Sequence, residues 1–586
     1  MAGTIQILRP NDIAAVHAAE KSLAERLDSL GSIVERLQRV LGLDDPRHES
    51  FFDLEILSQL IGERVVGQLP IRGMGESVKT YTVLGCVAGL VAKTFNGKLA
   101  EERMDGLIAE ERQDKLLIQS LAEVFKNKCL VGPTSGSYGI ALYIITEKLR
   151  EQCSIEVRGL PLFGADIPPR KLDIIKHYHE KEWGDLPIVE ALNRVTREQD
   201  SVRKLLELVA DQDNTIDGGF FVPTNPASMA DLEKLAATII DKAANLSEVP
   251  EWKQDILSNL GIAVDTTNNT LTINAAYADH IAGTELFAKA ILEKFPDVHV
   301  NILYPISAGA GALGPLRQAE KYPDRMHVLL ASDPANKAWQ NHRDQDEQTV
   351  FDPYYKQPAM QIGGTVAMPS NGMGSTPQPR IRGDAVTWLV EEGVKSQRAE
   401  FLPLTDVMRQ VARAIMTLDE VYQKRTSEEP VLMQELASAT SAGALLTRAI
   451  ETTHDIRQLA GFATQEIFQH GFDETQFLQL IFRDEPRSEA LNVADTWDEI
   501  KELAELQGNR VGDTPNKVLI FMQELQAAFA EFSEVHGMGF HNAEYSRGSI
   551  INSTSVTVIT ITGTNAGIPV PPEFIVKPSV PQARAA

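Results

Sequence analysis

Apolar residues recur at helical spacing near the start of the chain. Between residues 12 and 43 they return every three or four positions, which predicts one or two amphipathic helices. The residues of this stripe are Ile13, Val16, Leu23, Leu27, Leu30, Ile33, Leu37 and Leu41. A stripe of this kind must pack against another surface, and a partner subunit is one candidate.

Short β-like runs alternate with helical segments from about residue 60 to residue 226, and again from residue 284 to residue 331. This alternation predicts βαβ units, and therefore an α/β fold of parallel-type sheets flanked by helices. The predicted strands are 130–136, 154–158, 298–306 and 326–331, and the predicted helices are 140–148, 169–178, 284–295 and 315–322.

Other stretches interrupt this rhythm or end it. Residues 333–380 are rich in Pro, Gly, Asn and Gln and are predicted to be irregular, residues 384–532 are mostly helical, and residues 549–561 are predicted to be a strand. A short hairpin is predicted around Asn268-Asn269. We therefore divide the chain into an N-terminal helical arm (1–60), a first core part (61–227), an insertion (228–274), a second core part (275–450), a helical insertion that forms a lid or oligomer surface (451–545), and a final core strand with a Pro-rich tail (546–586).

The composition is that of a globular protein with an acidic surface. The 586 residues are 43% apolar and 23% charged, and 56 basic against 81 acidic residues give a formal charge of −25. Nucleic acid and anionic membranes are therefore not expected as partners. The sequence shows no signal peptide and no apolar run of membrane-spanning length, and its three cysteines lack metal-ligand spacing. We expect a cytoplasmic protein without a metal site.

The first candidate site is the loop of small residues from Ser307 to Gly314, followed by Pro315. It joins a predicted strand to a predicted helix, so its backbone N–H groups and the helix N-terminus could hold a phosphate group. The same residues would also suit a tight turn that needs only glycine, and the motif alone does not decide between the two.

Two further segments have a similar setting. Lys79 follows the loop Gly73-Met74-Gly75-Glu76 and begins an apolar helix, where a partly desolvated amine can act as a nucleophile; a solvated surface lysine is the alternative. The loop 132–139 offers backbone N–H groups and the hydroxyls of Thr134, Ser135 and Ser137 to a carboxylate, although it too could be only a glycine turn.

Taken in order, these segments resemble the fold-type II pyridoxal-phosphate (PLP) enzymes, the group of cysteine synthase, threonine synthase and serine/threonine dehydratase. Ser77-Val78-Lys79 is similar to the family's SVK or SFK Schiff-base lysine motif, and residues 133–142 (PTSGSYGIAL) resemble the cysteine-synthase substrate loop PTSGNTGIAL. Further resemblances, in chain order, are residues 220–226 to QFxNPxNP, Asp279-His280 with Gly283-Thr284-Glu285 to H…TGxEI, 307–314 to the phosphate loop GTGGTITG, 441–444 to SSGA, and Thr562-Gly563 to the terminal TG of threonine synthases.

The resemblance implies a function and a set of site residues. Lys79 would attach PLP and then act as the base for the α-proton, and Thr134, Ser135, Gly136 and Ser137 would hold the substrate carboxylate. The other cofactor-binding residues would be Gly309, Ala310, Gly311 and Ala312 for the phosphate, Ser137 for the ring hydroxyl, and Ser441 or Thr562 for the pyridine nitrogen. The resemblance also implies the reaction, β-elimination or β-replacement on a serine- or O-acylserine-like amino acid, and a homodimer.

The sequence also departs from the family pattern. Ser137 replaces the usual asparagine, the phosphate loop carries alanines in place of threonines, and about 110 residues separate Ser441 from Thr562. Two alternatives therefore stay open, namely β,γ-replacement on a phosphorylated amino acid as in threonine synthase, and a non-catalytic scaffold or binding protein. The segment His177-Tyr178-His179-Glu180 is not expected to bind a metal, because on a helix His177 and His179 point about 200° apart.

Overall fold

The computed structural model describes most of the predicted core. The described residues are 13–43, 51–68, 78–103, 108–126, 128–134, 137–163, 169–184, 270–272, 279–306, 310–332, 361–362, 365–366, 393–402, 404–423, 431–434, 436–469, 472–481, 493–508, 514–536, 550–554 and 557–562. Every structural statement below concerns these residues.

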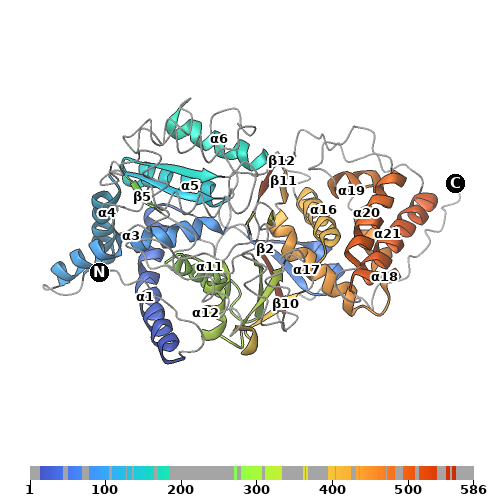
Figure 1. Ribbon diagram of the computed structural model, residues 1–586, viewed down its shortest axis with the longest axis horizontal. Coiled ribbons are helices and arrows are strands. Elements are labelled where there is room, and N and C mark those ends of the chain that lie inside the picture. Colours follow the sequence, from blue (N-terminus) through green and yellow to red (C-terminus); the bar gives the residue numbers. More distant parts are fainter. Residues whose placement is uncertain are drawn as a thin grey trace, which may run out of the picture.

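A six-stranded sheet occupies the middle of the molecule (Figure 1). Strands β6, β7 and β10 run parallel, whereas β13 is antiparallel to both of its neighbours, β2 and β6. It follows that β2 runs in the same direction as β6. The order across the sheet is β1 (Phe51–Asp53), β2 (Arg64–Gln68), β13 (Thr557–Thr562), β6 (His299–Ile306), β7 (Met326–Ser332) and β10 (Ala399–Leu402).

Helices cover both faces of this sheet. Successive side chains of its strands point to opposite faces, and those on each face are buried in a separate core. In β6, Ile302 and Tyr304 face the core that contains α3 (Lys79–Arg103), α11 (His280–Lys294) and α12 (Leu313–Lys321). Leu303 faces the opposite core, with α2 (Glu55–Ile61), α16 (Asp406–Gln423) and α17 (Leu436–Thr452). The result is a three-layered α/β/α arrangement.

A second, three-stranded sheet is entirely parallel. Its central strand is β3 (Lys128–Thr134), flanked by β4 (Val157–Phe163) and β5 (Thr270–Thr272). Helices α4 (Glu110–Phe125), α5 (Ser137–Cys153) and α6 (Pro169–Trp183) pack around it, and α5 also contacts α3. In Figure 1 this sheet lies on the left, beside the six-stranded sheet.

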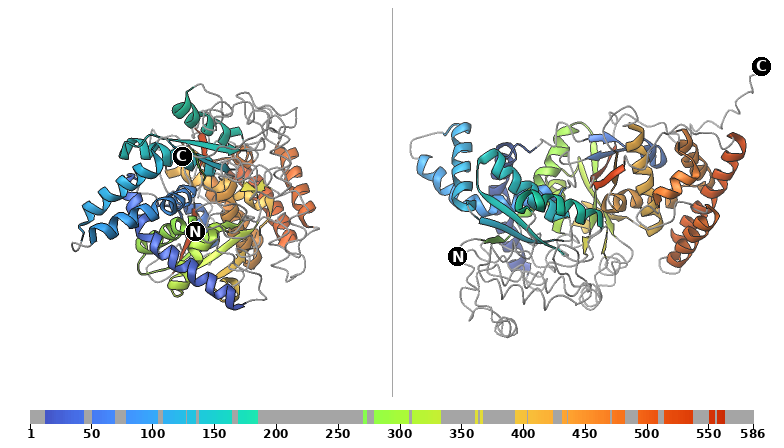
Figure 2. Two further views of the ribbon diagram at one scale, coloured as in Figure 1. Left: turned by 60° about the vertical axis from the view of Figure 1, so that its left-hand side comes forward. Right: turned by 90° about the horizontal axis from the view of Figure 1, so that it is seen from above.

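Four helices form the other end of the molecule, on the right in Figure 1 and in the right-hand view of Figure 2. They are α18 (Ile456–Gln469), α19 (Glu474–Ile481), α20 (Val493–Gly508) and α21 (Thr514–His536). Their apolar residues join the core on the α16–α17 side of the six-stranded sheet. Strand β11 (Val431–Gln434) lies beside α16 and pairs in parallel with β12 (Ile550–Thr554). Strand β8 (Gln361–Ile362) lies beside α17 and pairs with β9 (Thr365–Val366).

The N-terminal stripe forms one helix, α1 (Ile13–Val40), which packs against α3 and α11 of its own chain. Leu27, Leu30, Ile33, Leu37 and Leu41 are buried in the same core as these helices. From Leu27 to Leu41, the apolar face that the sequence predicts is therefore covered within the chain itself.

The predicted α/β class, with parallel strands flanked by helices, is confirmed, and several element ends differ from the prediction. The strand predicted from residue 154 begins at Val157, because Ser154 adopts a left-handed conformation (φ 55°) where α5 ends. The final strand is divided into β12 and β13, which lie in different sheets. The hairpin predicted around Asn268-Asn269 falls outside the described residues, and β5 itself pairs in parallel with β3. None of the described helices combines the length and apolar character needed to cross a bilayer.

Candidate functional site

The candidate lysine and the candidate phosphate loop follow strands that end at the same edge of the six-stranded sheet. Strands β2 and β6 run in the same direction, and β2 ends at Gln68 before the segment that leads to Lys79, whereas β6 ends at Ile306 before the small-residue loop. Ligands of α/β proteins bind at the carboxyl ends of such strands. This edge is therefore the natural place for a site.

Lys79 is the first residue of α3, and its side chain is partly buried. The carbonyl oxygen of Val78 accepts hydrogen bonds from the N–H groups of Tyr81 (3.1 Å) and Thr82 (3.3 Å), so Val78 sets the first turn of the helix. The N-terminus of a helix carries partial positive charge, which works against a protonated ammonium group at the same place.

One turn of α11 bridges the start of α3 and the start of α12. A Cβ atom on Gly283 would lie 1.8 Å from the carbonyl oxygen of Tyr81, so the backbones of α3 and α11 touch there. A Cβ atom on Gly314 would lie 2.3 Å from Oγ1 of Thr284, so α12 approaches the next residue of α11 equally closely. Only glycine permits these contacts, which bring the lysine end of α3 and the loop end of α12 against neighbouring residues of the same turn of α11.

The end of the small-residue loop lies over Tyr304. Residues Ala310–Ala312 form a short 3₁₀ turn that leads into α12, and a Cβ atom on Gly311 would lie 2.1 Å from the Tyr304 hydroxyl oxygen. The Tyr304 side chain is 6% exposed, and its hydroxyl has no hydrogen-bond partner among the described residues. Burial raises the pKa of this hydroxyl, so it stays protonated and can donate a hydrogen bond.

Polar side chains form a row across three neighbouring strands at this edge. Thr557 of β13 pairs with Gln68 of β2, and the register of β13 with β6 places Thr557 level with Tyr304. All three face the core of α3 and α11, because each lies two residues along its strand from a residue buried in that core. These buried residues are Val66, Ile559 and Ile302. Both side-chain polar atoms of Gln68 are buried without a partner among the described residues, as is the Thr80 hydroxyl beside Lys79.

Buried polar groups usually have hydrogen-bond partners, since leaving one unpaired costs about 1–3 kcal/mol. Among the exceptions, Gln68 and Tyr304 lie in one row at the carboxyl edge of the sheet, and Thr80 follows the candidate lysine in α3; the others, on Gln318, Arg325, Arg409 and Gln410, belong to other parts of the described chain. The first three residues, with the approach of Gly311 over Tyr304, fit a polar, anionic ligand that enters between the start of α3 and the start of α12.

The other predicted ligand-binding residues lie at the carboxyl end of the smaller sheet. Ser137 is the first residue of α5, and the backbone of Thr134 ends β3; Ser135, Gly136 and Gly309 fall outside the described residues. Next to Ser137, the Tyr138 hydroxyl lies 3.8 Å from Sγ of Cys86. Cys86 is two turns after Lys79 on α3, a distance of about 10 Å along the helix axis, so Ser137 starts its helix alongside the first half of α3.

The two residues predicted for the pyridine nitrogen lie in different places. Ser441 is buried in the second turn of α17, and α17 begins two residues after the end of β11. Strand β11 pairs with β12, and β12 is followed two residues later by β13. Thr562 lies at the other end of β13, paired with His299 at the start of β6. The structure therefore places Ser441 in a helix on the face of the sheet opposite to α3 and α11, and it places Thr562 at the end of β13 away from the site edge, because β13 runs antiparallel to β6.

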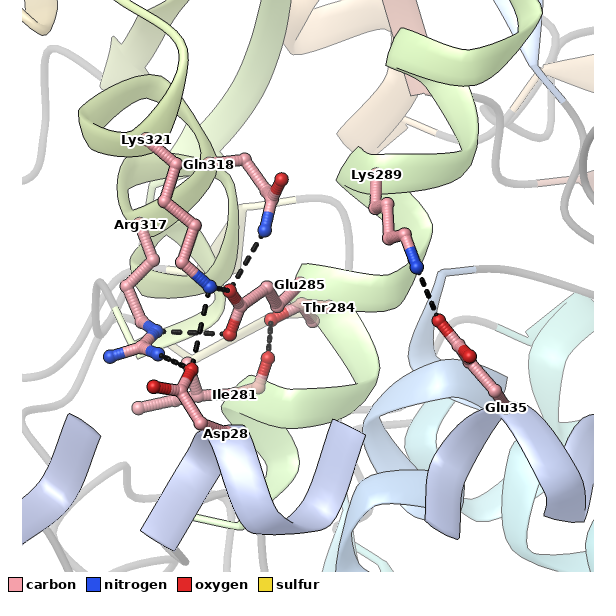
Figure 3. A network of polar contacts seen from close by, with 9 residues as sticks. All are labelled: Asp28, Glu35, Ile281, Thr284, Glu285, Lys289, Arg317, Gln318 and Lys321. Carbon is pink, nitrogen blue, oxygen red and sulfur yellow. Dashed lines mark hydrogen bonds and ion pairs between the residues drawn. The ribbon is translucent and has the colours of Figure 1, made fainter. Parts of the chain in front are cut away.

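Ion pairs connect α1 to the helices that shape the site (Figure 3). Glu285 of α11 accepts hydrogen bonds from Arg317 (2.9 Å), Gln318 (2.8 Å) and Lys321 (2.6 Å) of α12, and Arg317 also pairs with Asp28 of α1 at 2.8 Å. Figure 3 also shows Lys289 of α11 paired with Glu35 of α1. These contacts fix α12, and with it the end of the phosphate-loop segment, to α11.

A buried ion pair fixes the start of α11 as well. Both carboxylate oxygens of Asp279 accept hydrogen bonds from Arg26 of α1, at 2.5 and 2.6 Å. Burial raises the pKa of Asp279, and the Arg26 guanidinium opposes that rise. The sequence shows Asp279 only as part of the H…TGxEI resemblance and gives no sign of its partner on α1.

The two histidines of α6, His177 and His179, lie in different environments. His179 is buried, and its Nδ1 lies 2.8 Å from the Tyr143 hydroxyl, whereas His177 is exposed. Within the described ranges, no three His, Cys, Asp or Glu side chains gather in a way that could hold a metal ion.

Sequence reasoning did not find Tyr304, Gln68 or Thr80. Their only sequence signal is a polar side chain at the end of an apolar strand, or next to the candidate lysine. That signal becomes specific only when the register places Gln68 and Tyr304 in one row.

Comparison with known proteins gives similarities to solved structures only. No protein-family model matches the chain, and no curated protein matches it. The chain is similar to serine racemase from Dictyostelium discoideum, with 12% identity and a TM-score of 0.35 over 72% of this chain and 91% of that one. It is also similar to diaminopropionate ammonia lyase from Escherichia coli (11%, TM-score 0.39, 78% and 92%) and to threonine synthase from Escherichia coli (10%, TM-score 0.30, 76% and 94%).

Proposed function

We propose that this protein is a PLP-dependent lyase or transferase that eliminates or replaces the β-substituent of a serine- or O-acylserine-like amino acid. The observation that carries the proposal is the position of Lys79 and of the loop before α12, since the helices that they begin pack against neighbouring residues of one turn of α11. The sequence motifs around them are those that resemble fold-type II PLP enzymes.

The described residues fit PLP. When bound, PLP supplies the electron sink for breaking bonds at the α- and β-carbon atoms of an amino acid. Lys79 would attach it and would move the substrate α-proton at Nζ. The backbone N–H groups of Gly311 and Ala312 would bind the phosphate at the positive end of α12.

The remaining predicted residues would orient the substrate and the cofactor ring. Ser137, with Thr134, Ser135 and Gly136, would hold the substrate carboxylate. Ser441 would face the pyridine nitrogen with a neutral hydroxyl, and a hydroxyl leaves that nitrogen unprotonated. An unprotonated ring moderates the electron sink, which suits elimination or replacement at the β-carbon.

The threonine-synthase-like alternative loses its main support in the structure. Thr562 favoured it in the sequence, but Thr562 lies at the end of β13 remote from Lys79 and the loop. The non-catalytic alternative predicts a protein that does not bind PLP.

The first experiment asks whether Lys79 carries the cofactor. Purified wild-type protein incubated with PLP should turn yellow, and borohydride reduction followed by peptide mass spectrometry should place the added mass on Lys79. Lys79→Ala should abolish both signals. Lys98→Ala, on the same helix but paired with Glu123 at 2.9 Å, should keep both signals. A wild-type protein that binds no PLP would exclude the enzyme and leave the scaffold.

The second experiment separates substrates. Serine, O-acetylserine and O-phosphohomoserine are offered to the PLP-loaded protein, with and without sulfide as nucleophile. Pyruvate and ammonia from serine or O-acetylserine indicate β-elimination, and cysteine formed in the presence of sulfide indicates β-replacement. Turnover of O-phosphohomoserine alone would favour the threonine-synthase-like alternative.

We also propose a homodimer in a reducing, cytoplasmic compartment. All three cysteines of the chain are free in the structure, which agrees with such a compartment. Light scattering of the purified protein, which measures its mass in solution, tests the dimer.

A further inference from the structure

The loop that begins α12 lacks side-chain donors at the positions where the family resemblance leads one to expect threonines. Ala308, Gly311 and Leu313 stand at the threonine positions of GTGGTITG, and their side chains offer no hydrogen-bond donor to an anion. Backbone N–H groups and the helix N-terminus bind phosphate, and a hydroxyl donor adds a charge-assisted hydrogen bond. Ser307 is the hydroxyl residue of the loop and lies outside the described residues, whereas residues 310–314 carry no side-chain donor, so among the described residues such a donor would come from a neighbouring element.

Tyr304 is the residue in the right place. It lies two residues before the end of β6, on the face that α11 and α12 cover, and its hydroxyl approaches the backbone of Gly311. The hydroxyl is buried and has no hydrogen-bond partner among the described residues. An orphaned donor aimed at the backbone of an anion-binding turn is an independent indication that an acceptor belongs there.

We infer that the Tyr304 hydroxyl donates a hydrogen bond to the phosphate group of the ligand held at the start of α12. This inference rests on the proposed function, because it assigns one more residue to the phosphate end of the same site. Tyr304 is a binding residue in this scheme: it supplies from the strand a hydroxyl donor that residues 310–314 do not provide.

The inference gives Tyr304→Phe an unusual pair of effects. Removing a hydrogen bond to a charged group weakens binding. We therefore expect the Kd for PLP and for inorganic phosphate to rise by about 10- to 100-fold. Removing a buried hydroxyl that has no partner in the ligand-free protein relieves a desolvation cost, so the ligand-free variant should unfold at the same temperature as wild type or a higher one.

Tyr143→Phe is the matched control. Tyr143 is also a buried tyrosine, but its hydroxyl is paired with His179 at 2.8 Å, and it lies beside the smaller sheet. This variant should unfold at a lower temperature and keep the wild-type Kd for PLP and phosphate.

The experiment measures the Kd of PLP, pyridoxal and inorganic phosphate for wild type, Tyr304→Phe and Tyr143→Phe by calorimetry, together with the ligand-free unfolding temperatures. Pyridoxal lacks the phosphate, so Tyr304→Phe should leave its Kd unchanged.

An unchanged Kd for PLP and phosphate in Tyr304→Phe, or an equal loss of pyridoxal binding, would overturn the inference alone. A wild-type protein that binds phosphate but neither PLP nor pyridoxal would overturn the proposed function, while a phosphate Kd raised by Tyr304→Phe would still support the anion contact. Failure of wild type to bind any of the three probes would overturn both.

Discussion

Individual buried polar residues carry most of the functional information in this structure. Gln68, Thr80 and Tyr304 lie unpaired around the carboxyl edge of the six-stranded sheet, although each unpaired group costs stability. By contrast, the buried carboxylate of Asp279 is fully paired with Arg26. Under the proposed function, the unpaired groups of Gln68, Thr80 and Tyr304 would contact the ligand, whereas Asp279 holds α1 against the start of α11.

Asp419 is a buried carboxylate of the second kind, and it predicts a pH dependence of stability. Its oxygens accept hydrogen bonds from the N–H groups of Ile56 (2.8 Å) and Leu57 (3.4 Å) at the start of α2. Burial raises its pKa to about 8 against these hydrogen bonds. The folded state therefore binds a proton that the unfolded state has released above about pH 4, so the stability that Asp419 contributes is fully present below that pH and is lost as the pH rises toward 8.

Thermal unfolding between pH 5 and 8 tests this prediction. Each pH unit should cost wild type up to about 1.4 kcal/mol through this one group. Asp419→Asn keeps an oxygen acceptor for the Ile56 N–H group and cannot ionise, so its unfolding temperature should vary less with pH. Equal pH slopes for the two proteins would show that Asp419 does not titrate in this range.

At the scale of elements, the site depends on how closely α3 and α11 approach. A Cβ atom on Gly89 would lie 1.9 Å from Oδ2 of Asp279, whereas one on Gly97, on the same helix, would have no neighbour within 4 Å. Gly89→Ala should therefore destabilise the protein by about 1–3 kcal/mol through overpacking and displacement of the Arg26–Asp279 pair. Gly97→Ala should stabilise it by about 0.5–1 kcal/mol, because alanine is the better helix former.

Denaturant unfolding of the two variants measures both effects. Because the same substitution is made twice in one helix, helix propensity contributes equally, and the difference between the variants reports the contact with α11. Similar stabilities for Gly89→Ala and Gly97→Ala would contradict the close approach of the two helices.

Local elements could be predicted from the sequence, and their pairing could not. The helical stripe of α1, the β3–α5 unit and the β6–α12 unit depend on periodicity and glycine turns within single segments, and all three are present. The break between β12 and β13 was missed because a continuous Ser/Thr/Val/Ile run does not show where a chain changes sheets. Whether Thr562 or Thr557 reaches the site depends on strand direction, and direction is a long-range property.

The same distinction explains the site. Lys79, Gly311 and Ala312 could be proposed from motifs, since each motif is local. The row of Gln68, Thr557 and Tyr304 combines residues from the beginning, the end and the middle of the chain. No single segment contains the pattern, so only the sheet register could reveal it.

For the whole molecule, β13 is the strand that joins both cores. It lies between β2 and β6, with Ile559 facing the core of α1, α3 and α11, and Val558 facing the core of α16–α21. Residues 51–68 and 557–562 thus share a sheet although about 490 positions separate them in the chain. Loosening β13 should therefore loosen both sides of the molecule.

Ile559→Ala tests this coupling. Ile559 is 0% exposed, and the substitution should destabilise the protein by about 2–5 kcal/mol, whereas Ile520→Ala, on α21 and 44% exposed, should cost less than about 0.5 kcal/mol. Hydrogen exchange measured by mass spectrometry should then show faster exchange in α5 and in α21 of Ile559→Ala, because α5 belongs to one core and α21 to the other. If exchange rises in only one of these helices, the two cores unfold independently and β13 does not couple them.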